Sequence, residues 1–320
     1  MIKNKLKIIY MGTPEFAVAP LDEIVKSGFN VVGVVTTPDK PAGRGQKIAE
    51  SAVKKYAVKH QLNLLQPRKM KDPVFVNQLK ELNPDVIVVV AFRLLPKEIW
   101  SMPKLGTFNL HASLLPQYRG ASPINFAIIN GDKESGVTTF FIDDKIDTGE
   151  ILLQEKTQIK DNEDAGTLHD KLQEIGKNLV VKTLEGISTG KLKPQKQIYE
   201  EGIEYKYAPK IFKEDCLIQW NEPLEKVYNL IRGLSPYPVA FTNLIINDHS
   251  KILKIYKGHY KLEKHILPIG TVIVEGNKTF KIAANNGFYF PSEVQLEGKK
   301  RMSISDFING LTQKHNLFVK

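Results

Sequence analysis

Apolar and polar positions follow two different rhythms along this chain. In the first half, short apolar runs alternate with stretches that carry an apolar residue every three or four positions, the pattern of strands alternating with amphipathic helices. The expected strands cover residues 6–12, 30–37, 84–92 and 106–113, and the expected helices cover 13–28, 49–61, 73–83 and 122–132. We therefore predict a doubly wound, Rossmann-like α/β sheet, whose ligands bind beyond the carboxyl ends of its strands.

Local signals refine three of these elements. The run 84–92 is apolar on both faces, as expected of a central parallel strand covered by helices. For the helix at 13–28, Thr13 is the expected N-cap, Pro14 the first helical residue and Gly28 the residue past the end. Between the second strand and the next helix, PDKPAGRGQ predicts a polar loop.

The rhythm changes after residue 135. Strands are expected at 136–142 and 147–159 and a long helix at 164–188, whereas residues 191–210 lack a clear period and predict a linker. A helix at 223–235 then precedes short strands at 252–258, 270–276, 279–285 and 287–295, which favour a small β-barrel or sandwich. We predict two domains, 1–206 and 207–320.

Composition narrows the functional classes. The chain has 320 residues, 42% of them hydrophobic and 25% charged, as in soluble globular proteins. It contains no apolar run long enough to span a bilayer and no secretory signal pattern at its start, so we expect a cytoplasmic protein without membrane contact. Cys216 is the only cysteine and the seven histidines lack metal-binding spacing, so we predict neither a disulfide nor a metal.

Positive charge is concentrated in the last third of the chain. Residues 206–320 carry 17 Lys/Arg against 10 Asp/Glu, and therefore hold +7 of the total net charge of +10. Such an excess favours a polyanionic partner such as a nucleic acid, although a lysine-rich, solvated surface explains it equally well.

The stretch FNLHASLLPQYRG, residues 108–120, carries the strongest chemical signal. Residues i and i+2 of a strand project from the same face, so Asn109 and His111 are expected to point together near the carboxyl end of a parallel strand. An amide and an imidazolium side by side can stabilise an oxyanion. In the alternative interpretation, Asn109 caps the following turn and His111 is a half-buried structural histidine.

Asp147 lies in an acidic turn, DDKIDTGE, that follows the next expected strand. A carboxylate that returns to an imidazole orients it and stabilises its protonated form. Asp147 could instead be a turn residue that bonds its own backbone.

With these motifs in view, the chain resembles the folate-dependent formyltransferases. The matching segments are NLHASLLPQYRGASPINFAIINGDKESGVT and DTGEIL. Three further segments are similar to the C-terminal domain of the methionyl-tRNA formyltransferases, an OB-like barrel: YAPKIFKEDCLIQW, IRGLSPYPVAFT and GKKRMSISDFINGL. The segment PDKPAGRGQK is similar to that family's inserted, tRNA-contacting loop.

The resemblance implies a reaction and a set of residues. A formyl group would pass from 10-formyltetrahydrofolate, a cosubstrate, to the α-amine of initiator methionyl-tRNA, with Asn109, His111 and Asp147 as catalytic residues and no metal. Folate would contact the loop after His111 and the segment after the strand at 84–92: Ser113, Leu114, Leu115, Pro116, Phe92, Arg93 and Leu94. The second of these segments, VVVAFRLLP, is one residue shorter than the family's commoner AYGQILP form.

For tRNA, the resemblance implies contact through the loop at about 36–50, with Gly43, Arg44, Gly45 and Lys47. Lys251, Lys254 and Lys257 are candidate contacts in the basic tail, whereas Phe16 could pack against the methionyl group or simply belong to the core. We expect no obligate protein partner and a monomer. Two other functions stay open: formyl transfer to a small amine such as an amino sugar, and RNA binding by a protein that has lost its catalysis.

Overall fold

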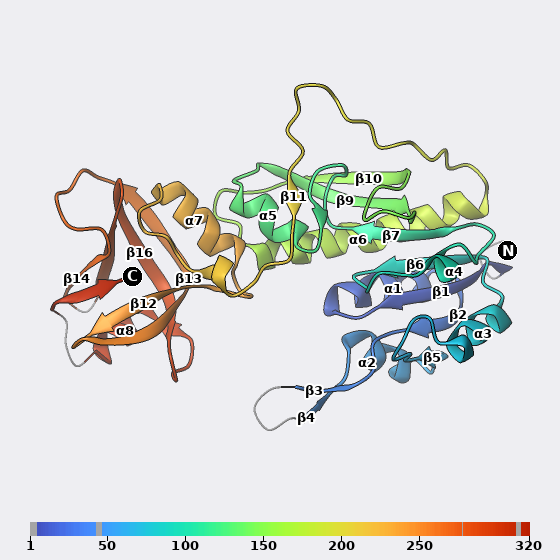
Figure 1. Cartoon of the computed structure of the whole chain (residues 1–320), viewed down its shortest axis with the longest axis horizontal. Coiled ribbons are helices and arrows are strands. Elements are labelled where there is room, and N and C mark those ends of the chain that lie inside the picture. The colour runs from blue at the N-terminus through green and yellow to red at the C-terminus, as the bar shows by residue number, and fades with distance from the viewer. Residues whose placement is uncertain (1–4, 43–46, 277, 312–314) are drawn as a thin grey trace. The chain divides into compact units, whose positions relative to one another are not determined.

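The computed structural model describes the whole chain apart from residues 1–4, 43–46, 277 and 312–314 (Figure 1). The chain forms two compact units. The first comprises Met1–Gly120, Ser135–Thr157 and His169–Tyr207, and the second comprises Ala121–Glu134, Gln158–Leu168 and Ala208–Lys320. The second unit thus takes two segments from the middle of the sequence, and the boundary at 206/207 stays a prediction.

A seven-stranded sheet forms the centre of the first unit. Its strands are β1 (Lys7–Gly12), β2 (Asn30–Val35), β5 (Leu64–Leu65), β6 (Val86–Val90), β7 (Thr107–His111), β9 (Glu134–Phe141) and β10 (Ile151–Gln158). Their order is β10-β9-β7-β6-β1-β2-β5, in which the strands from β5 to β7 are parallel and β9 is antiparallel to β7. The predicted Rossmann-like α/β sheet is confirmed.

The register of the central strands places three sequence segments at one edge of this sheet. The chain turns from β1 towards β2 and later crosses to β6 on the other side of β1, so the topological switch point lies between β1 and β6. Gly12 pairs with Val90, and Val90 pairs with Leu110. The residues that follow these three therefore meet at the carboxyl edge, where ligands of such sheets bind.

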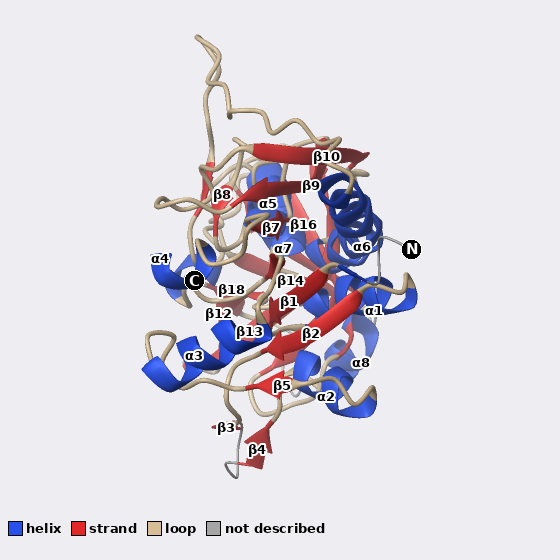
Figure 2. Ribbon diagram, turned by 90° about the vertical axis from the view of Figure 1, so that its right-hand side faces the viewer, coloured by secondary structure: helices blue, strands red, loops and turns tan. Residues whose placement is uncertain are grey.

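The same unit contains four helices and most of a fifth: α1 (Val18–Lys26), α2 (Ala52–Lys59), α3 (Pro73–Leu82), α4 (Lys97–Trp100) and most of α6 (Ala165–Ser188). Figure 2 shows these helices in blue and the strands in red. The prediction of Thr13 as N-cap and Pro14 as the first helical residue is wrong. Pro14 is still extended, a 3₁₀ turn η2 (Glu15–Ala17) follows, and α1 begins only at Val18. This start leaves Pro20 in the first turn of α1, where the missing N–H of a proline costs no hydrogen bond.

The first strand of a hairpin stem lies within the predicted polar loop at 38–46, and the second strand lies just after that loop. β3 (Lys40–Ala42) pairs antiparallel with β4 (Lys47–Ala49). Asp39, at the base, accepts hydrogen bonds from Lys54 of α2 and from Gln66 Nε2, so the stem is anchored to the sheet unit. Gly43, Arg44 and Gly45 lie outside the described residues.

Helix α6 covers one face of β7 and β9. A methyl group on Gly176 would lie 2.9 Å from Leu110 Cδ2, and Thr139 Oγ1 lies 2.8 Å from Thr183 Oγ1. Leu110 and Thr139 are paired across the two strands. Side chains alternate along a strand, so Asn109 and His111 lie on the opposite face, away from α6.

The second unit contains a β-barrel. Six strands close a ring in the order β13-β12-β18-β14-β15-β16, in which β16 returns to β13, and β17 (Met302–Ser303) extends β16. The ring strands are β12 (Ala240–Ile246), β13 (His249–Leu262), β14 (Thr271–Glu275), β15 (Thr279–Ala284), β16 (Gly287–Leu296) and β18 (Leu317–Val319). The predicted C-terminal barrel is confirmed, with β12, β17 and β18 in addition to the predicted strands.

The barrel core is formed by Trp220, Phe280, Tyr289 and Phe307, with aliphatic residues of every ring strand around them. Helix α7 (Leu224–Gly233) packs on α5 (Pro123–Ile129), and α8 (Ile304–Asn309) lies between β17 and β18 in sequence. Two further short elements are η3 (Glu214–Cys216) and the sheet of β8 (Arg119–Gly120) with β11 (Tyr207–Ala208).

In the part of the chain that the structure describes, no helix has the length and apolar character needed to cross a membrane. The same residues contain no group of three or more His, Cys, Asp or Glu placed to hold a metal ion. The expectations of a cytoplasmic, metal-free monomer stay predictions.

Candidate active site

Asn109 and His111 stand side by side on β7, on the face opposite α6. Their partners on β9 are Phe140 and Thr138. His111 is buried and its ring meets that of Phe140 edge-on at 6.4 Å between centroids, while Asn109 is half-buried. Among the described residues, none forms a hydrogen bond with the Asn109 side chain, so its amide remains available to a ligand.

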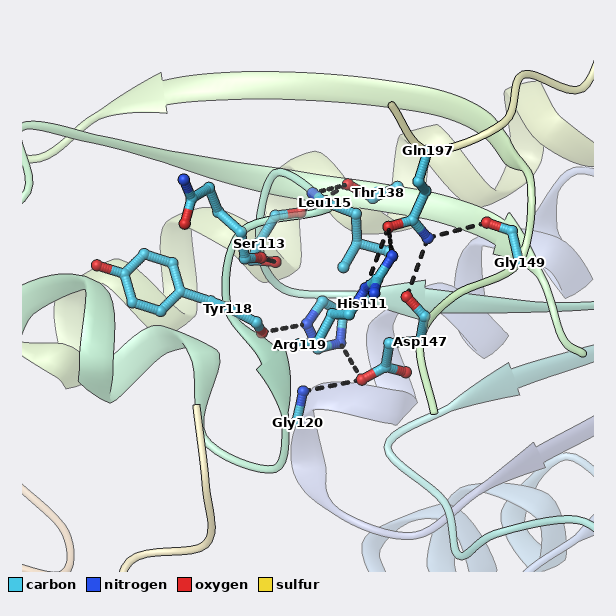
Figure 3. Close-up of polar contacts among 11 residues, drawn as sticks. His111, Ser113, Leu115, Tyr118, Arg119, Gly120, Thr138, Asp147, Gly149 and Gln197 are labelled. Carbon is cyan, nitrogen blue, oxygen red and sulfur yellow. Dashed lines mark hydrogen bonds and ion pairs between the residues drawn. The ribbon is translucent and has the colours of Figure 1, made fainter. Parts of the chain in front are cut away.

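His111 lies between two oxygen acceptors (Figure 3). Nε2 is 2.8 Å from the carbonyl oxygen of Tyr118, and Nδ1 is 3.8 Å from Oδ2 of Asp147. A carbonyl oxygen can only accept, so Nε2 must carry a hydrogen. The Asp147 carboxylate faces Nδ1 beyond hydrogen-bond distance, so it can act on the ring there only through its charge.

The Asp147 carboxylate is directed to the site and not to its own turn. Oδ2 accepts a hydrogen bond from the backbone N–H of Gly120 at 2.9 Å, a residue 27 positions earlier in the chain. The carboxylate that bonds within this turn is that of Asp143, which accepts from the N–H of Lys145 and from Thr148 Oγ1. Asp147 itself has φ +54°, a left-handed conformation that is uncommon for residues other than glycine.

The loop after His111 is held by a hydroxyl of the neighbouring strand. Thr138 Oγ1 donates to the carbonyl oxygen of Ser113 and accepts from the N–H of Leu115. Gln154 Nε2 donates both to this hydroxyl and to the carbonyl oxygen of Leu115, each at 2.9 Å. Ser113 Oγ donates to the carbonyl oxygen of Gln117 at 2.6 Å. The loop is therefore shaped before any ligand arrives.

The structure brings both predicted folate segments to the carboxyl edge of the sheet, one after β7 and the other after β6. In the first, Ser113 and Leu115 are buried, whereas Leu114 and Pro116 are half-buried. Leu114 also lies over Gly136, where a Cβ would be 2.5 Å from Leu114 Cδ2. The Ser113 hydroxyl serves the loop itself, so the loop offers mainly apolar surface and backbone groups.

In the second segment, Arg93 folds back onto the chain. Its guanidinium donates to the carbonyl oxygens of Pro67 and Arg68 and lies 5.5 Å from the Phe92 ring centroid. Burial lowers the pKa of Arg93 from its ordinary value. Leu94 is 77% exposed, and Phe92 packs on the core beneath the segment.

Sequence reasoning missed Gln197, which lies in the predicted linker. Its Oε1 accepts from Arg119 Nη2 at 2.6 Å and Nε at 3.2 Å, and its Nε2 donates to the carbonyl oxygens of Asp147 and Gly149, both at 2.9 Å (Figure 3). No local signal marks this glutamine, because the segment has no period and no motif. Tyr118 and Gly120 were also missed, since they act through backbone atoms.

Of the predicted tRNA-binding residues, the backbone of Lys47 belongs to β4, and the other three lie outside the described residues. In the second unit, Lys251 and Lys257 are exposed and Lys254 is half-buried along β13. Phe16 is buried and meets His169 edge-on, as a core residue does.

The chain resembles known proteins over nearly its whole length. The formyl transferase family matches residues 4–184, and the formyl transferase C-terminal domain matches residues 210–312. Methionyl-tRNA formyltransferases of Flavobacterium johnsoniae and Bacteroides thetaiotaomicron are 52% and 50% identical to it over 309 and 313 residues, which is 97% of both chains in each comparison.

Among solved structures, an N-formyltransferase from Helicobacter canadensis, in complex with folinic acid and dTDP-3-aminofucose, matches with a TM-score of 0.66 at 23% identity. The match covers 93% of this chain and 100% of the other. This likeness concerns the fold.

Proposed function

Because this chain belongs to the methionyl-tRNA formyltransferase family, we propose that it transfers a formyl group from 10-formyltetrahydrofolate to the α-amino group of methionyl initiator tRNA, in support of translation initiation. The observation that carries the chemistry is the placement of His111 between Tyr118 O and Asp147, beside Asn109 on the same strand. Nothing in RNA binding alone requires that arrangement.

In the proposed mechanism, the α-amine attacks the formyl carbon and a tetrahedral intermediate forms. Its oxyanion accepts hydrogen bonds from the Asn109 amide and from Nδ1–H of His111. Nδ1 is the imidazole donor available for this task because Nε2 is bonded to Tyr118. The 3.8 Å between Nδ1 and the Asp147 carboxylate exceeds a hydrogen bond, so Nδ1–H is free to turn to the oxyanion while the negative charge still stabilises the imidazolium.

The intermediate collapses when the bond between the formyl carbon and N10 of the folate breaks. The amine loses one proton and N10 gains one, so the transfer needs no net proton from solvent. The Asp147 carboxylate is the group placed to relay that proton, through water, to the departing N10. Alignment of the two substrates contributes much of the rate, because the reaction joins two separate molecules.

The pterin is proposed to lie against the two segments that follow β6 and β7, namely Phe92–Leu94 and Ser113–Pro116. Their apolar side chains and backbone groups suit a flat heterocycle with hydrogen-bonding edges. For the tRNA, the proposed contacts are the segment at about 36–50, with Gly43, Arg44, Gly45 and Lys47, and the lysine-rich barrel. Cationic groups on such elements neutralise phosphates without reading bases.

The test is formyl transfer from 10-formyltetrahydrofolate to charged initiator tRNA, run beside free methionine and an amino-sugar nucleotide. We expect turnover on the charged tRNA only, with a steep decrease as salt rises because phosphate contacts release counterions. Turnover restricted to the small amine, with little salt dependence, would show that the acceptor is wrong while the formyl chemistry stands.

A further inference from the structure

The side chain of Gln197 connects the two backbone segments that hold the His111–Asp147 pair. We propose that Gln197 is a positioning residue for formyl transfer, which keeps the Asp147 turn and the strand Tyr118–Gly120 in the relative placement that the pair requires. This inference rests on the proposed function. Gln197 touches neither His111 nor the Asp147 carboxylate, so it acts through their backbone supports.

The orientation of the Gln197 amide is fixed by the chemistry of its neighbours. A guanidinium has no acceptor, so the Gln197 oxygen must face Arg119, and the two carbonyl oxygens of Asp147 and Gly149 have no donor, so the NH₂ group must face them. Both amide hydrogens and both oxygen lone pairs are used. A side chain with only one of these two functions cannot replace it.

Arg119 stands between the two residues that hold the pair. Tyr118, directly before it, binds Nε2 of His111 through its carbonyl oxygen, and Gly120, directly after it, binds Asp147 Oδ2 through its N–H. The hydrogen bonds between Gln197 and Arg119 therefore hold the Tyr118 carbonyl oxygen, which sets the His111 tautomer, and the Gly120 N–H, which sets the Asp147 rotamer. We call the link that the Gln197 side chain makes between Arg119 and the Asp147 turn the tether.

The NH₂ group of Gln197, at the other end of the tether, bonds the Asp147 turn, whose backbone conformation needs stabilisation. Asp147 adopts the left-handed conformation, which a Cβ disfavours. Gly149 is packed so closely that a Cβ there would lie 1.6 Å from the carbonyl oxygen of Phe141. Within the described chain, Gln197 is the side chain that donates to the carbonyl oxygens of both Asp147 and Gly149.

The segment that carries Gln197 is held in place independently of its side chain. Gln195 exchanges two backbone hydrogen bonds with Ile151, and Lys206 bonds Tyr118 and Gln117 through its backbone. Loss of the Gln197 side chain should therefore leave the segment where it is. This allows a substitution to test the tether alone.

The experiment compares Gln197→Leu, which removes every hydrogen bond at similar volume, with Gln197→Glu, which keeps the acceptor for Arg119 but cannot donate to the turn. Gln195→Leu is the matched control, because that side chain is exposed and its hydrogen bonds are made by the backbone. We expect kcat to fall by about 10- to 100-fold in both Gln197 variants. KM for both substrates should stay within about twofold of wild type and the control should remain unaffected.

Two further measurements separate positioning from a general loss of structure. If Gln197 acts by holding the pair, Gln197→Leu should slow the reaction much less in an Asp147→Asn background than in the wild type. In ¹⁵N spectra of histidine-labelled protein, the His111 ring nitrogens, assigned by their loss in His111→Ala, should shift in Gln197→Leu and stay unchanged in Gln195→Leu.

A Gln197→Leu enzyme with kcat within twofold of wild type, or losses that multiply in the double variant, would overturn the inference. Thermal unfolding of each variant identifies one that does not fold, in which case Gln197→Glu decides the question. The ¹⁵N spectra require no turnover, so they test the tether even if the wild-type protein transfers no formyl group, an outcome that would refute the proposed function instead.

Discussion

Replacement of Asp147 by Asn isolates the charge of the carboxylate from its shape. The amide oxygen of an asparagine can still accept the hydrogen bond from Gly120, so the turn keeps its main contact. Its NH₂ group would then face Nδ1 of His111 and favour the neutral imidazole, which has an acceptor there. The variant should therefore fold normally and lose the stabilisation of the imidazolium.

The size of the loss follows from the distance. At 3.8 Å between Nδ1 and Oδ2, with an effective dielectric constant of about 20, the attraction between imidazolium and carboxylate is about 4 kcal/mol. Desolvation of the pair offsets part of this, because both side chains are largely buried, and leaves about 2–3 kcal/mol. That range corresponds to a decrease in kcat of about 30- to 150-fold.

The assay is the initial rate of formylation of charged initiator tRNA at saturating folate, with tRNA affinity measured separately by filter binding. Asp143→Asn is the control, since Asp143 lies in the same loop but bonds only its own turn. We expect unchanged affinity in both variants and a slow reaction only in Asp147→Asn. A rate above one third of wild type in Asp147→Asn, or equal losses in both variants, would refute this account of the pair.

Other sites give predictions of different kinds. Replacement of Arg44 and Lys47 by Ala should weaken tRNA binding and reduce the slope of log affinity against log salt by about 1 to 2, with kcat at saturating tRNA unchanged. Gly149→Ala should lower the free energy of unfolding by about 3 kcal/mol in urea titrations, because its Cβ would overlap the Phe141 carbonyl oxygen. Burial raises the pKa of the Cys216 thiol, so fewer thiolates exist near neutral pH and alkylation should be much slower in the folded protein than in urea; equal rates would contradict the buried placement.

The sequence predicts most of the sheet because its pattern is local. Runs such as 84–92 are apolar on both faces only in a covered central strand, and β6 is indeed buried throughout. The start of α1 was missed because two signals compete: Pro14 suits a first helical position, but Pro20 must also lie in a first turn, and the later start satisfies it. The hairpin at 40–49 was missed because each of its strands is three residues long.

For the site, the sequence predicts which residues share a face of one strand, but not which residues from other segments meet them. Asn109 and His111 share a face because they are two residues apart. The return of Asp147 to His111 depends on a turn between two strands, and its support depends on Gln197, 50 residues further along an aperiodic segment. Contacts made by backbone atoms, such as those of Tyr118 and Gly120, do not depend on the type of side chain, so the sequence does not reveal them.

The dependence of the Asp147 turn on residues 195–206 has a consequence for biosynthesis. A nascent chain folds from its N-terminal side as it leaves the ribosome. The sheet strands and the Asp147 turn emerge first, but Gln197, which binds this turn, and Lys206, which binds the loop of Tyr118, follow later. A nascent chain that has exposed only the sheet would therefore hold its reactive groups loosely, and competence for the reaction would be gained only as the apparent connector to the barrel is translated.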